Sequence, residues 1–187
     1  MPPTRTIETF PERVPLEAVR ADLAVRIPQT VKDGTAIRRA AVLGVITATG
    51  YVRERSRSNA SADAATGQKV IAVDDALVFK VGDVLTLEDG TAIGTIDAGG
   101  VNVDDNELTC VANIAIAITD GDAVLASDGS QVAQEIADEA VAATETTNTQ
   151  LSPYIGGYLK RDLIIGLDAS AIAELGGAVK PNNIFKF

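Results

Sequence analysis

The clearest candidates for binding chemistry in this sequence are three arginines at alternating positions, Arg53, Arg55 and Arg57. On a β-strand, a period of two places all three side chains on one face. Guanidinium groups bind phosphates or carboxylates, because each presents a planar fork of N–H donors. The three arginines therefore have two interpretations. They form either a nucleic-acid patch or the seam between two pieces of the protein, and their spacing also suits carboxylate partners at a protein interface.

The distribution of charge disfavours the nucleic-acid patch, and the linker-like composition of residues 58–67 favours the seam. Residues 1–57 have ten Lys/Arg and six Asp/Glu, whereas residues 58–150 have two and seventeen, a net charge of −15. Phosphate binding needs cations whose field is not cancelled nearby, and the arginines lead directly into this acidic segment. An acidic surface also repels anionic membranes. We therefore expect no nucleic-acid partner and no membrane partner, and we take Arg53, Arg55 and Arg57 as candidate interface residues.

The residue types of common catalytic and metal sites are missing or scattered. The sequence has no His, which excludes His-based triads, and its single Cys, Cys110, excludes thiolate zinc sites. Asp104-Asp105 and Asp120-Gly121-Asp122 could suggest calcium, but they lack EF-hand spacing and are typical of turns. Paired carboxylates of the glycosidase type stay open, because nothing selects two of the 26 acids. We expect a protein that is not an enzyme and has no metal and no cofactor.

The segments around the arginines predict an interrupted β-domain. "AAVLGVITATG" (40–50) reads as a strand, and "SNASADAATG" (58–67) has the small, polar composition of a linker. Residues 68–127 contain five or six short apolar segments separated by turns, with a hairpin signal at Asp89-Gly90 and a glycine-rich loop at 97–106. This pattern is typical of a small closed β-barrel.

The chain after residue 127 looks like a continuation of the first domain. "YIGGYLKRDLIIGL" (154–167) reads as a strand pair or bulged strand bent at Gly156-Gly157. "DASAIAELGG" (168–177) is the clearest helix, with Asp168 or Ser170 as its cap and Gly176-Gly177 as a left-handed stop. A strand-like tail follows.

The N-terminal 33 residues predict an extended arm, because five prolines between positions 2 and 28 disfavour helix. Such a segment orders against a partner, and strand addition to a sheet edge is one mode of doing so. Its apolar side chains include the candidate binding residues Ile7, Phe10, Val14 and Leu16. Residues 15–26, and also residues 1–11, have an alternative, which is packing on the chain's own domain.

The order of these segments resembles the head decoration proteins of tailed bacteriophages, the family typified by the lambda head protein D. In that family a "DG…VA.GIL" strand leads through a polar loop to a "GxY/F" segment. The matching residues here are Asp128, Gly129, Val132, Ala133 and Ile136 for the strand, and Gly156, Gly157 and Tyr158 for the second segment. The acidic segment lies outside this pattern and is similar to "VDDA..F.VGD.LTL" barrels of phage structural proteins.

The resemblance implies a mainly β (α+β) decoration fold with one short C-terminal helix, interrupted by an inserted small β-barrel. The expected domains are an arm (1–33), a discontinuous decoration domain (34–57 and 128–187) and the barrel (68–127). The implied function is structural cement: a homotrimer, made in the host cytoplasm, that binds the major capsid protein on the outer capsid surface of the virion.

The alternative function is a β-rich binding module on the virion surface, for a receptor or a glycan, with the barrel as its active part. Glycan sites use exposed aromatic rings, and Phe79 is the only aromatic residue between positions 68 and 126. This composition favours the cement function.

Overall fold

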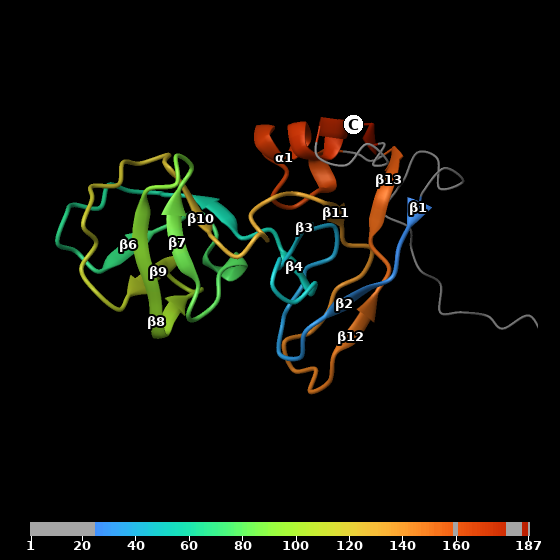
Figure 1. Cartoon of the computed structure of the whole chain (residues 1–187), viewed down its shortest axis with the longest axis horizontal. Helices are drawn as coiled ribbons and strands as arrows, with labels where there is room; N and C mark the ends of the chain where they lie inside the picture. Colours follow the sequence, from blue (N-terminus) through green and yellow to red (C-terminus); the bar gives the residue numbers. More distant parts are fainter. Residues whose placement is uncertain (1–24, 159–160, 179–184, 187) are drawn as a thin grey trace, which may run out of the picture.

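The computed structural model describes residues 25–158, 161–178 and 185–186. The chain is mainly β with one short α-helix, which confirms the predicted class. Figure 1 shows two lobes side by side, each built on one curled sheet. The predicted capsid-binding residues Ile7, Phe10, Val14 and Leu16 lie outside the described residues.

The first lobe, which we call the body, is an eight-stranded sheet with the order β1-β13-β11-β3-β4-β2-β12, and β14 also pairs with β13. Its strands are β1 (Val25–Arg26), β2 (Gln29–Val31), β3 (Val42–Val45), β4 (Val52–Glu54), β11 (Glu135–Ile136), β12 (Thr149–Leu151), β13 (Tyr154–Tyr158) and β14 (Phe185–Lys186). The sheet therefore unites strands from before residue 57 with strands from after residue 126.

Both faces of the body sheet are buried. Val42 and Leu43 are consecutive in β3 but belong to different hydrophobic clusters, because successive strand side chains point to opposite faces. The Val42 cluster includes Tyr154 and the helical residue Leu175, whereas the Leu43 cluster includes Val31 from β2. The helix thus covers only the Val42 side.

The helical segment is short and irregular. The 3-10 turn η3 (Arg161–Leu163) precedes α1 (Ala169–Ala173), which continues as a π-helical turn, η4 (Glu174–Ala178). Asp168 caps α1 by accepting a hydrogen bond from the Ala171 N–H at 2.6 Å, which confirms the predicted start. The predicted left-handed stop is wrong, because Gly176 lies inside η4.

The predicted end of the arm at residue 33 lies inside the body. β2 pairs with β12 on one side and with β4 on the other, and its Val31 is fully buried. β1 pairs with β13. Residues 25–33 therefore belong to the folded body, and the extended arm is a prediction for residues 1–24 only.

The second lobe, which we call the barrel, comprises residues 57–126. Its sheet has the order β5-β10-β7-β8-β9-β6. The strands are β5 (Arg57–Asn59), β6 (Val70–Ala72), β7 (Val84–Leu87), β8 (Ala92–Asn102), β9 (Glu107–Cys110) and β10 (Ala123–Ala126), with a 3-10 turn, η2 (Ala76–Val78). Backbone pairing of Ala60 with Val73 joins the outer strands β5 and β6, so the sheet closes on itself around one apolar core.

Two barrel segments predicted as irregular are part of its wall. The predicted linker 58–67 contains the end of β5, and Ala60 and Ala64 lie in the barrel core. The predicted loop 97–106 is largely strand β8. Its small residues serve close packing, because a Cβ at Gly100 would lie 2.4 Å from the Thr109 carbonyl oxygen. Likewise Gly156-Gly157 lies within β13 and not at a bend.

Candidate functional site at the junction of the two lobes

The chain crosses between body and barrel twice, first between β4 and β5 and again between β10 and β11. These two crossings are hydrogen-bonded to each other. Ser56 and Ser130 face one another with their hydroxyl oxygens 2.6 Å apart, and the Ala126 N–H donates to the Ser56 carbonyl at 3.0 Å. The second crossing lies directly on β3, where a Cβ at Gly44 would be 1.9 Å from the Ser130 carbonyl oxygen. The crossings therefore form a compact double connection.

Arg53 extends from the body strand β4 to the barrel. Its guanidinium donates to both carboxylate oxygens of Asp83, at 2.9 and 2.7 Å, and to the Val78 carbonyl at 2.7 Å. A further bond reaches Asp128, on the second crossing, at 3.2 Å. Arg53 is only 2 % exposed, so one buried cation joins both lobes.

Arg55 and Arg57 converge on Asp168 at the start of α1. Arg55 donates to Asp168 Oδ1 at 2.9 Å and also contacts Ser170 and Glu174. Arg57, from the barrel strand β5, has its Nε 3.0 Å from Asp168 Oδ2. Burial alone would raise the pKa of Asp168, but the Ala171 N–H and Arg55 outweigh it and hold the pKa below its usual value. Asp168 therefore links helix, crossing and barrel as a carboxylate.

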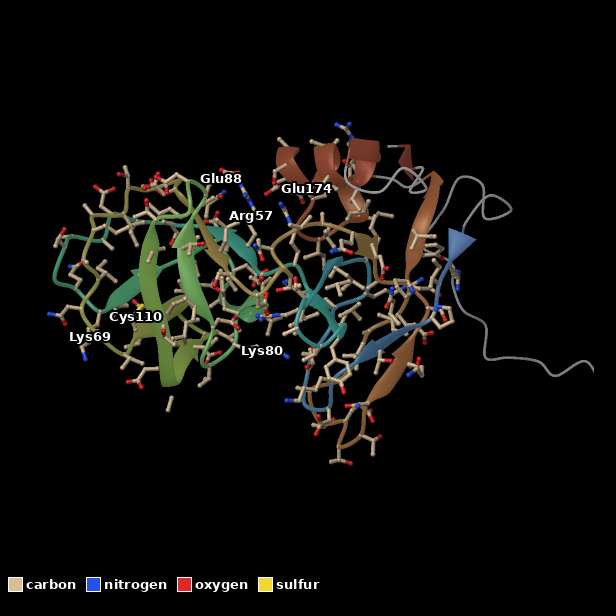
Figure 2. All side chains as sticks on the ribbon, in the orientation of Figure 1. Arg57, Lys69, Lys80, Glu88, Cys110 and Glu174 are labelled. Carbon is tan, nitrogen blue, oxygen red and sulfur yellow. The ribbon has the colours of Figure 1, made fainter. Side chains whose placement is uncertain are left out.

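Arg57 also holds a barrel carboxylate. Its two terminal nitrogens donate to the two oxygens of Glu88, at 2.9 and 3.1 Å, and this contact lowers the pKa of Glu88. Figure 2 shows Arg57 beside Glu88 at the junction, with Glu174 on the neighbouring helical segment.

The predicted strand face with three arginines is wrong in its geometry. The strand is interrupted between β4 and β5, so Arg53 binds Asp83 whereas Arg55 and Arg57 share Asp168. All three have carboxylate partners, but these partners are within the same chain. Because Arg53 and Arg55 are 2 % and 4 % exposed, they do not form a surface for another molecule.

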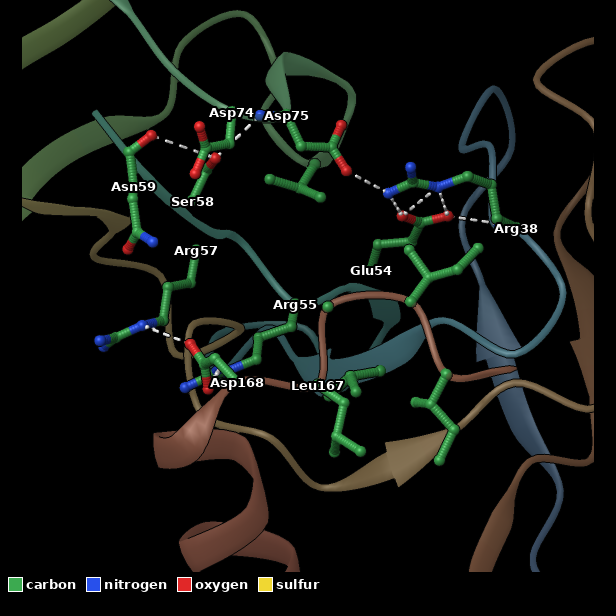
Figure 3. A pocket seen from close by; sticks show the side chains of 15 residues that line it. Arg38, Glu54, Arg55, Arg57, Ser58, Asn59, Asp74, Asp75, Leu167 and Asp168 are labelled. Carbon is green, nitrogen blue, oxygen red and sulfur yellow. Dashed lines mark hydrogen bonds and ion pairs between the residues drawn. The ribbon is translucent and has the colours of Figure 1, made fainter. Parts of the chain in front are cut away.

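An open cavity of about 370 Å³ lies at this junction. Figure 3 shows it lined by Arg55, Arg57 and Asp168 on one side and by Asp74 and other barrel residues on the other. In its wall, the body residue Arg38 binds Glu54 at 2.6 Å and the barrel residue Asp75 at 2.6 Å. Burial alone would lower the pKa of Arg38, but the bonds to Glu54 and Asp75 raise it. These two contacts join the body to the barrel through Arg38.

No family model, curated protein sequence or solved structure matches the chain. Within the described ranges, no group of three or more Asp, Glu or Cys residues is arranged to hold a metal ion, and no helix is long and apolar enough to cross a membrane. Burial raises the pKa of the Cys110 thiol, which keeps it protonated.

The arginine–carboxylate pairs of the junction act as a clamp that fixes the barrel on the body.

The partners of the arginines could not be predicted from the sequence, because they are remote in the chain. Arg53 and Asp83 are 30 positions apart, and Arg55 and Asp168 are 113 positions apart. Asp168 was predicted only as a helix cap. Arg38 and Lys80 carried no sequence signal at all, because nothing in their spacing distinguishes them from surface cations.

Lys80 is a further cation at the junction, and its pKa is lowered. Burial, with the positive charge of Arg53, lowers it to about 8, and the ammonium donates to Thr35 of the body. The unfolded chain keeps this proton up to about pH 10.5, so between pH 8 and 10.5 the unfolded state binds more protons. Stability from this group therefore increases as the pH rises through that range.

We predict that the Lys80→Met variant lacks this increase. In urea unfolding, the midpoint of the wild type should rise relative to that of K80M between pH 7 and pH 9.5, since the two proteins differ only at residue 80. Parallel midpoints at all pH values would show that Lys80 titrates normally in the folded chain.

Proposed function

We propose that this protein is a capsid decoration protein, a cement that binds the outer surface of a phage head. The observation that carries the proposal is the adjacency of three segments that are distant in sequence. The strand of the "VLGVITATG" segment (β3), the strand after Asp128-Gly129 (β11) and the "YIGGY" strand (β13) are consecutive neighbours in the body sheet. The residues on which the resemblance rests therefore belong to one structural unit.

The position of the barrel fits the same function. It leaves the body after β4 and returns before β11, so the body sheet is complete without it. Three arginine-centred clamps, at Arg38, Arg53 and Arg57, then bind it to the body. A barrel held in one orientation is suited to a static, load-bearing role, whereas a hinged enzyme requires lobes that move.

The proposed partners are the major capsid protein and two further copies of this chain. We place residues 1–24 as the segment that contacts the capsid, because they precede β1, and β1 pairs with β13 at one end of the body sheet. A segment leaving a sheet edge can extend another sheet by main-chain hydrogen bonds.

The test is co-sedimentation of the purified chain with undecorated capsids of the same virus, followed by electron microscopy of the pellet. We expect saturable binding, threefold density on the outer surface and a higher temperature of capsid disruption. A chain that stays in the supernatant at saturating concentration would refute the proposal.

A further inference from the structure

One outer face of the barrel has an unusual group of exposed β-branched side chains. Val70, Val84 and Val111 are 41 %, 49 % and 53 % exposed. Single exposed apolar residues are normal on a protein surface. Here the sheet register places three of them on the same face, with Thr95 and Thr109 between them.

The register defines this face strand by strand. Val84 in β7 pairs with Thr95 in β8, and the Val111 N–H, just after β9, donates to the Thr95 carbonyl at 2.9 Å. Two residues earlier on β9, Thr109 pairs with Val70 in β6. The neighbouring residues on these strands are buried in the barrel core: Leu85, Leu108, Cys110 and Ile71. Because successive side chains of a strand point to opposite faces, the valines and threonines of these pairs point outward. We call Val70, Val84, Thr95, Thr109 and Val111 the valine stripe.

The surroundings of the stripe are acidic. The barrel has twelve Asp/Glu and three Lys/Arg. Three of the acids, Asp75, Asp83 and Glu88, pair with arginines at the junction, and the rest have no ion pair within the described part of the chain. Glu107 lies on the stripe side of β9, two residues before Thr109, and Asp97 follows Thr95 by two residues on β8.

The barrel cations leave this charge uncompensated. Arg57 and Lys80 face the junction, where they contact Glu88 and Thr35. Lys69 alone lies beside the stripe, with its ammonium bonded to the Val111 carbonyl at 2.9 Å. A second barrel would bring the same negative charge against this face, so self-association there is opposed by repulsion.

We propose that the valine stripe is a docking face for a basic protein, one that presents aliphatic side chains surrounded by Lys or Arg. The aliphatic side chains of the partner cover the valines, and its cations meet Asp97, Glu107 and the neighbouring acids. Apolar contact supplies affinity, and charge complementarity supplies orientation and selects against acidic partners. This inference concerns the barrel alone and goes beyond the proposed attachment of the body to a capsid.

The test uses three synthetic strand-forming peptides with alternating Val/Lys, Ser/Lys and Val/Glu residues. Titration into the full chain, followed by heteronuclear NMR, should show that the Val/Lys peptide binds and perturbs amides of β6 to β9. The double variant Val84→Ser/Val111→Ser should bind it about tenfold more weakly, which corresponds to about 1.4 kcal/mol. The Ser/Lys peptide should bind weakly and equally to both proteins.

Val103→Ser is the matched control, because Val103 is 46 % exposed on the same barrel but outside the stripe. This variant should bind the Val/Lys peptide like the wild type, and circular dichroism should show all proteins folded. Equal binding of the Val/Lys peptide by the stripe variant, or equal binding of Val/Glu and Val/Lys peptides by the wild type, would overturn the proposal. Neither result depends on capsid binding, so the two proposals fail separately.

Discussion

Replacing Arg53 with Met is expected to lower the free energy of unfolding by about 3–5 kcal/mol, the range for a buried ion pair that loses one partner. Methionine retains much of the side-chain volume but donates no hydrogen bond. Asp83 is then left without its bidentate partner, and the Val78 carbonyl loses its donor. Both groups are well shielded from water, which is the reason for the large cost. Urea unfolding followed by circular dichroism measures the change.

The matched control is Arg57→Met, which removes an arginine from the same short segment. Its partners Glu88 and Asp168 are 64 % and 40 % exposed, so water replaces the lost contacts. Exposed pairs contribute about 0–1 kcal/mol, and we expect a change within that range. Equal losses for the two variants would show that burial of Arg53 has no special energetic role.

The double variant Arg53→Met/Asp83→Asn separates the ion pair from the packing. Without its negative charge, residue 83 no longer needs a buried cation, and its amide oxygen can still accept the Lys80 backbone N–H, which now bonds at 2.8 Å. The double variant should therefore be more stable than R53M alone. A double variant that is less stable by the sum of the two single losses would contradict the clamp.

The fold could be predicted from sequence where a local signal agreed with the final packing. Asp89-Gly90 between two alternating segments predicted a hairpin, and Gly90 takes φ +85° between β7 and β8. Asp168 predicted the helix start for a similar local reason, since a cap depends on residues within one turn. Such features need no knowledge of the rest of the chain.

The segments that could not be predicted are those whose small residues serve close packing. The composition of 58–67 and of 97–106 is that of a linker and a loop, yet Ala60 and Ala64 fill the barrel core and Gly100 permits contact with β9. A loop and a closely packed strand can both be rich in small residues, so composition alone does not distinguish them. Only the packing against the neighbouring strand does. The junction was hidden for a related reason, because its carboxylates come from distant parts of the sequence.

Deleting residues 1–14 is expected to abolish retention of the protein on capsids while its folding is preserved. The deletion leaves β1 and β2 in place, with their pairing to β13, β12 and β4. The melting temperature and the oligomeric state should therefore remain almost unchanged. Co-sedimentation of the truncated protein with undecorated capsids measures the retention.

The size of this effect follows from avidity. Each arm residue that becomes ordered costs about 1–2 kcal/mol, and burial of Ile7, Phe10, Val14 and Leu16 returns about 1.5–3 kcal/mol each, so one arm binds modestly. In a trimer, three arms on one rigid shell raise the effective affinity by about 10²–10⁴. Loss of the arm removes this gain at once in all three copies.

A single substitution provides the finer test of the same idea. Phe10→Ala should measurably weaken retention, because it removes the largest of the four apolar side chains, whereas Thr9→Ala should bind like the wild type. The conclusion depends on both variants folding normally, which their melting temperatures report. If the protein without residues 1–14 occupies capsids to the wild-type level, then the arm is not the attachment. Since Arg53 and Arg55 are enclosed at the junction, the binding surface would then lie on exposed parts of the body.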